Sequence, residues 1–312
     1  MPRDGSPQLP AGVVPAEPMS IGEVANPPFA VLPRPQRLFL HRAERFEALA
    51  PGHQLETYLH FLAAICRAQH EAQAGLPEPA LPSPERLEQS RANGLPPLSV
   101  ATLPSDDAGE RAFLALIDAL RSKELTETSR AALESVAAAT PEDRNALMVA
   151  VLLEQIPEDE IAPHVLAAAA VQVHMARLAA GLEADSLVRI ADGACPACGS
   201  GPVSSAIVGW EGASGTRFCT CSICATQWNV PRIRCLSCGS ESGIAYYSLE
   251  GANGHVSGET CDGCKSYVKI LHQHKDASLD PVADDVASLA LDLTLGREGW
   301  QRTSLNPFLM GY

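Results

Sequence analysis

Two stretches of equal length decide the fold of this chain: CPACGSGPVSSAIVGWEGASGTRFCTCSIC (residues 195–224) and CLSCGSESGIAYYSLEGANGHVSGETCDGC (residues 235–264). Each begins and ends with a Cys-x-x-Cys pair, and 22 residues separate its two pairs. A shift of 40 positions places every cysteine of these pairs on a cysteine, and Gly199 on Gly239. The spacing indicates that one small metal-binding unit has been duplicated.

Each unit supplies four cysteine thiolates, the ligand set of a tetrahedral zinc or iron ion with metal–sulfur distances of about 2.3 Å. We expect each copy to close its own site, because a tandem copy of a self-sufficient unit explains the constant offset. A cross-braced arrangement is the alternative, and disulfides or redox-active dithiols are the alternatives to metal. The choice between iron and zinc stays open, since thiolate tetrahedra accept both. The predicted ligands are Cys195, Cys198, Cys221 and Cys224 for one ion, and Cys235, Cys238, Cys261 and Cys264 for the other.

Strand-like runs, rich in β-branched and aromatic residues, occur only around the cysteines. They cover residues 202–209, 216–220, 226–230, 244–249 and 266–271. We expect them to form the small antiparallel sheets of two rubredoxin-like or zinc-ribbon modules, residues 190–232 and 233–275. Such short modules cannot bury an adequate apolar core, so metal is expected to supply folding energy of about 10 kcal/mol or more. Metal removal should then unfold a ribbon and spare the rest of the chain.

Residues 37–189 are predicted to form an α-helical domain with one core. Helical periodicity covers residues 37–50, 54–74, 84–92, 107–123, 127–139 and 159–181. A further helix begins with Thr140 as N-cap and Pro141 in its first turn. Cys66 shares the helical spacing of Leu59 and Leu62, which predicts a core residue rather than a ninth ligand.

The two ends of the chain differ in character. Residues 1–36 contain nine prolines and no apolar signal-peptide core, so we expect a flexible arm. No run of 18 apolar residues occurs, which predicts a cytoplasmic protein without membrane insertion. Residues 276–312 are expected to form a helix over 281–296 and a tail, 304–310, that packs down. Asp284 and Asp285 on that helix are interpreted as a solvated face or helix-start charges rather than a catalytic pair.

Charge and motif content exclude several functions. The net charge is −14 and region 190–275 has no basic excess, whereas binding to nucleic acid requires a basic face. No glutamate has a histidine three residues later, which disfavours a di-iron helical bundle. Phosphate-loop, nucleophile-elbow and zinc-protease motifs are absent, so no small-molecule substrate is evident. His272 and His274 are interpreted as surface residues, and Cys219, which has no counterpart in the repeat, as buried.

Several segments together resemble the formate dehydrogenase accessory protein FdhE family. They are CPACGSGPVSS (195–205), CSICATQW (221–228), CLSC (235–238), CDGCKSYVK (261–269), VADDVASL (282–289), SLNPF (304–308), RAER (42–45) and HQLETYL (53–59). The resemblance covers nearly the whole chain after residue 36. It implies a helical domain followed by two rubredoxin-like modules. It also implies that the eight matching cysteines hold redox-active iron.

The same resemblance implies an accessory role rather than an enzymatic one. The partner would be the catalytic subunit of a molybdenum- or tungsten-containing formate dehydrogenase, bound in the cytoplasm before the enzyme is exported. Two alternatives stay open: a rubredoxin-like electron-transfer protein, and a zinc-ribbon scaffold that binds a protein partner without redox chemistry. The residues predict neither the oligomeric state, nor the partner-binding face, nor the chemical step performed on the partner.

Overall fold

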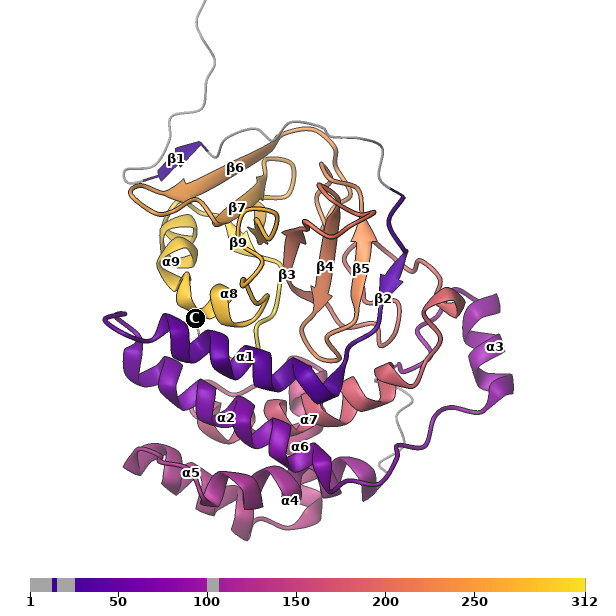
Figure 1. The fold of residues 1–312 in the computed structure, drawn as a ribbon, viewed down its shortest axis with the longest axis vertical. Coiled ribbons are helices and arrows are strands. Elements are labelled where there is room, and N and C mark those ends of the chain that lie inside the picture. Colours follow the sequence, from indigo (N-terminus) through magenta and orange to yellow (C-terminus); the bar gives the residue numbers. More distant parts are fainter. Residues whose placement is uncertain (1–12, 16–25, 100–106, 312) are drawn as a thin grey trace, which may run out of the picture.

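The computed structural model describes residues 13–15, 26–99 and 107–311. Most of the predicted proline-rich arm therefore lies outside the described residues. Within it, β1 (Val13–Pro15) pairs with β6 (Ile244–Leu249), and β2 (Ala30–Val31) pairs with β5 (Gln227–Val230). A layer of helices lies on one side of the molecule and a β-sheet on the other (Figure 1).

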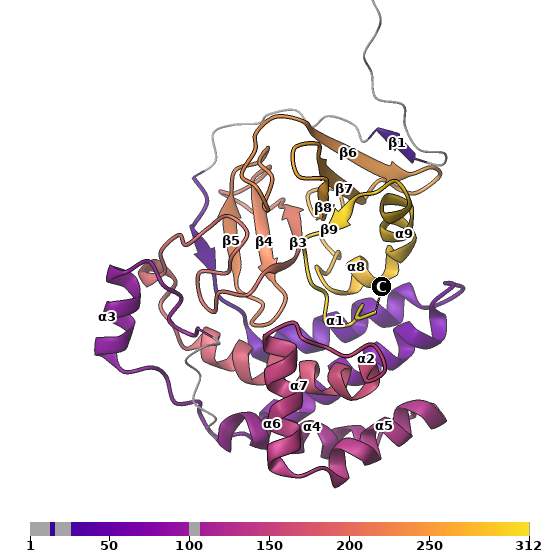
Figure 2. The same cartoon turned by 180° about the vertical axis from the view of Figure 1, so that it is seen from behind.

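The helical layer contains α1 to α7, close to the predicted ranges. The helices are α1 (Pro35–Leu49), α2 (Glu56–Ala74), α3 (Pro84–Ala92), α4 (Asp107–Arg121), α5 (Glu127–Ala138), α6 (Pro141–Leu152) and α7 (Ile161–Ala180). Thr140 caps α6 in a capping box with Asp143, as the sequence predicts. α7 is apolar around nearly its whole circumference and is buried along most of its length, as such helices are. It packs against α1 and α2 within the helical layer, and Figure 2 shows it from the side opposite to Figure 1. Cys66 lies in the core of this layer, as predicted.

The strands of both cysteine modules join one nine-stranded sheet. Its order is β1-β6-β7-β8-β3-β4-β5-β2, with β9 (Gln301–Arg302) on β8 (Ser266–Leu271). The two halves meet where β3 (Pro202–Ile207) runs parallel to the end of β8. Within each module the strands pair antiparallel, as predicted, but the expectation of two separate sheets is wrong. Parallel pairing between segments more than 60 residues apart leaves no local signal in the sequence.

Four strands were not predicted from the sequence: β1, β2 and β9, which are two or three residues long, and the longer β7. β7 (Val256–Cys261) pairs with β6 on one side and β8 on the other, whereas β4 (Arg217–Cys221) is its counterpart in the first module. Its sequence, VSGETC, contains a glycine and a glutamate and lacks strand alternation. β7 is buried because it lies inside the sheet and because a distant residue pairs with its glutamate. Only the tertiary structure provides these two conditions.

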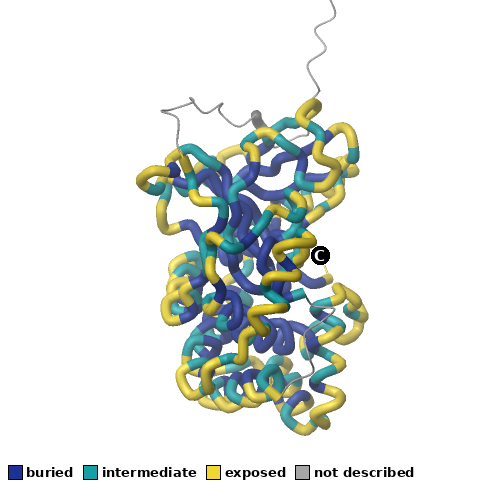
Figure 3. Tube along the Cα trace, turned by 90° about the vertical axis from the view of Figure 1, so that its right-hand side faces the viewer, coloured by how far each residue is buried: buried dark blue, intermediate teal, exposed yellow. Residues whose placement is uncertain are grey.

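The two modules are buried to different degrees. All four predicted ligands of the first module belong to the same hydrophobic core as α1, α2, α4 and α7. The second module instead packs Tyr247 and Tyr267 against α9 (Leu289–Arg297) in a small separate cluster. Buried segments fill the middle of the molecule, and exposed segments occupy both ends (Figure 3).

The C-terminal region departs from the prediction at two points. The expected single helix is divided at Ser288 into α8 (Ala283–Ala287) and α9. Asp284 and Asp285 lie in the first turn of α8, as one predicted alternative had it, but both are buried, so the solvated-face alternative is wrong. Asp284 accepts two hydrogen bonds from Arg45 of α1, at 2.9 and 2.6 Å. Asp284 thus fastens the C-terminal region to α1, whereas Asp285 pairs with Lys269 and Arg302. The tail packs down as predicted, with Phe308 fully buried.

His272 is also buried, contrary to the surface interpretation, whereas His274 is half-buried. The Nε2 atom of His272 lies 3.1 Å from the Ser257 hydroxyl, and burial lowers the pKa of His272 to about 4. In the described ranges, no helix has both the length and the apolar character needed to cross a membrane.

Candidate metal centres

The structure brings the first four predicted ligands together in one compact group. Cys195 and Cys198 come from the turn before β3, Cys221 is the last residue of β4, and Cys224 lies in the turn that follows. Their Sγ atoms lie within 4.8 Å of one another, with Cys195–Cys224 at 3.6 Å and Cys198–Cys221 at 3.4 Å. All four side chains are buried.

The second four predicted ligands form an equivalent group with a different environment. The sulfur–sulfur distances are 3.6 Å for Cys235–Cys264 and 3.7 Å for Cys238–Cys261. Cys238 is exposed and Cys264 half-buried, whereas Cys235 and Cys261 are buried. Cysteines of the two units do not mix, so the sequential grouping agrees with the prediction and the cross-braced alternative does not.

These distances fit a tetrahedral metal–thiolate centre. Four sulfurs at about 2.3 Å from one ion are separated by about 3.8 Å, close to the observed pairs. All ten cysteines lie in the described residues and none forms a disulfide, which requires sulfurs about 2 Å apart. Each group could therefore hold one metal ion.

The backbone of the turns is shaped to place the sulfurs. Gly199 and Gly239 have φ angles of +87° and +73°, which glycine adopts readily. The N–H of each donates to the carbonyl of the first cysteine of its pair, at 2.8 and 3.0 Å. Cys221 Sγ accepts from the N–H groups of Ile223 and Cys224, both at 3.4 Å. Such donors stabilise thiolate charge and orient the ligands.

Within each group the local electrostatics favour a thiolate at one cysteine, whereas burial raises the pKa of Cys195 and Cys221 in the first group and of Cys261 in the second. Hydrogen bonds from Cys195, and from the other two thiols, hold the pKa of Cys198 well below its usual value. In the second group, burial opposes ionisation of Cys264, but hydrogen bonds led by that from Ser266 lower its pKa to about 6. Ser266 Oγ lies 2.9 Å from the Cys264 sulfur. Thiolate is the form that binds metal.

A buried ion pair between the modules was not foreseen. Arg217 of β4 donates to Glu259 of β7 at 2.8 Å, and both side chains are almost completely buried. Arg217 also donates to the carbonyl of Arg234, directly before Cys235, at 3.1 Å, and Glu259 accepts from Tyr246 at 2.9 Å. The pair fixes the start of the second cysteine group relative to the first module.

One sequence signal could have located this pair. Glu259 occupies the position that corresponds to Cys219 in the repeat, so the duplication is broken there. Cys219 itself is fully buried, as predicted, and burial raises the pKa of its thiol to about 12. Cys219 belongs to neither cysteine group.

The fold and the two cysteine groups define a class: a helical protein that carries two rubredoxin-like four-cysteine modules in one sheet. The family models "FdhE, N-terminal", "FdhE, central domain" and "FdhE, C-terminal domain" match residues 27–192, 194–232 and 233–309. The chain belongs to the FdhE family.

Several known proteins are similar to this chain over most of its length. A "Protein FdhE homolog" from Rhizobium meliloti (strain 1021) is 43% identical over 298 residues, covering 95% of this chain and 97% of the relative. "Protein FdhE" from Escherichia coli (strain K12) is 35% identical over 288 residues, covering 90% and 91%. The crystal structure of the FdhE protein from Pseudomonas aeruginosa superposes with a TM-score of 0.82 at 34% identity, covering 91% of this chain and 99% of that one.

Proposed function

We propose that this protein is an accessory protein for the maturation of formate dehydrogenase. It binds the catalytic subunit of that enzyme in the cytoplasm and presents iron held by the two four-cysteine groups. It is an accessory protein rather than an enzyme. Membership of the FdhE family supports the role, and the geometry of both groups supports the metal sites.

The observation that carries the proposal is the unequal burial of the two groups. All four ligands of the first group are buried in the helical core, whereas Cys238 of the second is exposed. An ion beneath the surface can exchange electrons only with a partner that approaches its ligands closely. The second group is thus the one that meets the partner, and the first group stabilises the fold.

The residues divide these tasks as follows. A bound iron ion supplies one-electron chemistry at a tetrahedron of thiolates. The turn around Gly239 exposes one edge of the second group, and the Arg217–Glu259 pair holds that group in place. Besides the two cysteine groups, the described residues contain no cluster of His, Cys, Asp and Glu with metal-ligand spacing.

The partner is tested with a purified catalytic subunit of formate dehydrogenase and the tagged, metal-loaded protein. We expect the subunit to be retained. In cells, Cys235→Ala/Cys238→Ala should abolish formate dehydrogenase activity while the catalytic subunit is still synthesised. Cys66→Ala is the matched control, because Cys66 belongs to neither group. Full activity in a double variant confirmed to lack metal would refute the redox role.

The metal is tested independently by absorption spectroscopy and elemental analysis. Oxidised iron in a four-thiolate site is coloured, whereas zinc is colourless and has no redox chemistry. Two colourless zinc ions per chain, together with retained partner binding, would replace the redox proposal by a zinc-ribbon scaffold.

A further inference from the structure

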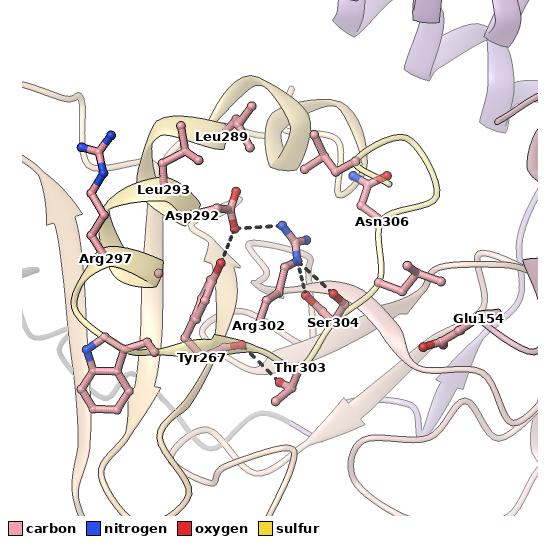
Figure 4. Close-up of a pocket in the computed structure, with 14 residues that line it drawn as sticks. Glu154, Tyr267, Leu289, Asp292, Leu293, Arg297, Arg302, Thr303, Ser304 and Asn306 are labelled. Atoms are coloured by element: carbon pink, nitrogen blue, oxygen red, sulfur yellow. Dashed lines mark hydrogen bonds and ion pairs between the residues drawn. The ribbon is translucent and has the colours of Figure 1, made fainter. Parts of the chain in front are cut away.

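A groove of about 670 Å³ lies between α9, the C-terminal tail and the loop after α6 (Figure 4). We call it the α9 groove. Its walls include Glu154, Leu289, Leu293, Arg297, Trp300 and Arg302.

The α9 groove begins beside the exposed cysteine group. The Lys265 ammonium, directly after Cys264, lies 4.7 Å from the centre of the Trp300 ring. The N–H of Gln301 donates to the Lys265 carbonyl at 2.8 Å. A molecule bound in the groove therefore lies next to the surface where the second group is accessible.

The floor of the groove is polar but electrically balanced. Arg302 donates to Asp292 at 2.9 Å and to Asp285 at 2.6 Å, and Lys269 forms ion pairs with the same two carboxylates. Tyr267 donates to Asp292 at 2.8 Å. Two cations face two carboxylates, so the floor does not select a net charge.

The ends of the groove carry opposite charges without partners. Arg297 and Glu154 are exposed, and Figure 4 shows them at opposite ends. Neither side chain forms an ion pair or hydrogen bond in the part of the chain that the structure describes. Leu293, on the wall between them, is 46% exposed, and Leu289 lies beside it.

We propose that the α9 groove binds an extended segment of the formate dehydrogenase catalytic subunit. In this segment an aliphatic side chain lies between an acidic residue, which pairs with Arg297, and a basic residue, which pairs with Glu154. The aliphatic side chain packs against Leu289 and Leu293. The inference rests on the proposed function, whose partner it uses, and assigns a binding surface to it.

The chemistry of the groove favours a polypeptide segment. The volume suits a few side chains, and the exposed walls leave room for the chain to enter and leave. An apolar anchor flanked by charges at the rim is the usual arrangement of a protein interface, where the charges fix orientation. A floor that is polar but has no net charge is compatible with both the N–H and the C=O groups of a peptide.

The test measures affinity between the metal-loaded full-length protein and the purified catalytic subunit by biolayer interferometry. We expect Leu293→Asp and Arg297→Glu each to weaken binding by about 10-fold or more. Leu114→Asp and Arg111→Glu are matched controls at exposed positions of α4 that do not line the groove, and should stay within about 2-fold of wild type. Each change is on the surface, so folding is preserved.

A photo-crosslinking residue at position 293 supplies an independent readout. It should link to the catalytic subunit, and the same residue at position 114 should not. Wild-type binding with unaffected groove variants and no crosslink overturns the groove inference and leaves the proposed function standing. A wild-type protein that does not bind the subunit overturns both.

Discussion

Removal of the cation from the buried pair between the modules should destabilise the protein strongly. In Arg217→Met, the Glu259 carboxylate stays buried and keeps only its hydrogen bond from Tyr246. The variant also loses the hydrogen bonds of Arg217 to Ser205 at 3.2 Å and to the Arg234 carbonyl at 3.1 Å. Breaking a buried pair from one side costs about 3–5 kcal/mol, because an uncompensated charge remains.

The assay is urea denaturation of the metal-loaded protein, followed by circular dichroism, with metal content measured for each variant. The free energy of unfolding should fall by about 4 kcal/mol for Arg217→Met. Arg217→Met/Glu259→Leu should recover about 2 kcal/mol of this loss, since no charge is then left buried. Arg111→Met, at an exposed position of α4, should change stability by about 0.5 kcal/mol or less.

Two outcomes would refute this reasoning. The first is a loss below about 1 kcal/mol for Arg217→Met, which would mean that water or another group solvates Glu259. The second is a double variant less stable than the single one, which would place the stabilisation in the apolar and backbone contacts of each side chain separately.

Three further predictions follow from burial and packing. Chelation should remove metal from the exposed second group first. Cys198→Ser should lower the unfolding midpoint of the helices more than Cys238→Ser, since only the first group lies in the helical core. Equal midpoints for the two variants would contradict this. Burial lowers the pKa of His272 to about 4, so between about pH 6.5 and about 4 the unfolded chain binds a proton that the folded chain does not. Stability should fall by up to about 3 kcal/mol as the pH drops through this window, and His272→Asn should flatten that slope. Gly258→Ala should cost about 1–3 kcal/mol, because its Cβ would lie 2.5 Å from a leucine of α9, whereas Gly201→Ala, with no atom within 4 Å, should be close to neutral.

Local features of the sequence determined the elements and the cysteine groups. In a Cys-x-x-Cys turn, a few neighbouring dihedral angles determine where the two sulfurs lie. The 40-residue offset then indicates which turns belong to the same cysteine group, whatever the rest of the fold is. The helix that starts at Thr140 was predicted for the same reason, because an N-cap and an N1 proline act within one turn.

Only the tertiary structure decided the burial of these features. The repeat gives the two cysteine groups the same spacing, yet the first lies in the helical core and the second at the surface. The reason is that α7 packs against the first module only, where Gln172 donates to the Ser222 carbonyl at 2.8 Å. In the sequence, nothing near Asp284 and Asp285 indicates that they are buried. In the structure, Arg45, Lys269 and Arg302 from other segments pair with them. A charge or a metal ligand can be recognised from its neighbours in sequence, but its exposure depends on which distant elements cover it, and that information is not local.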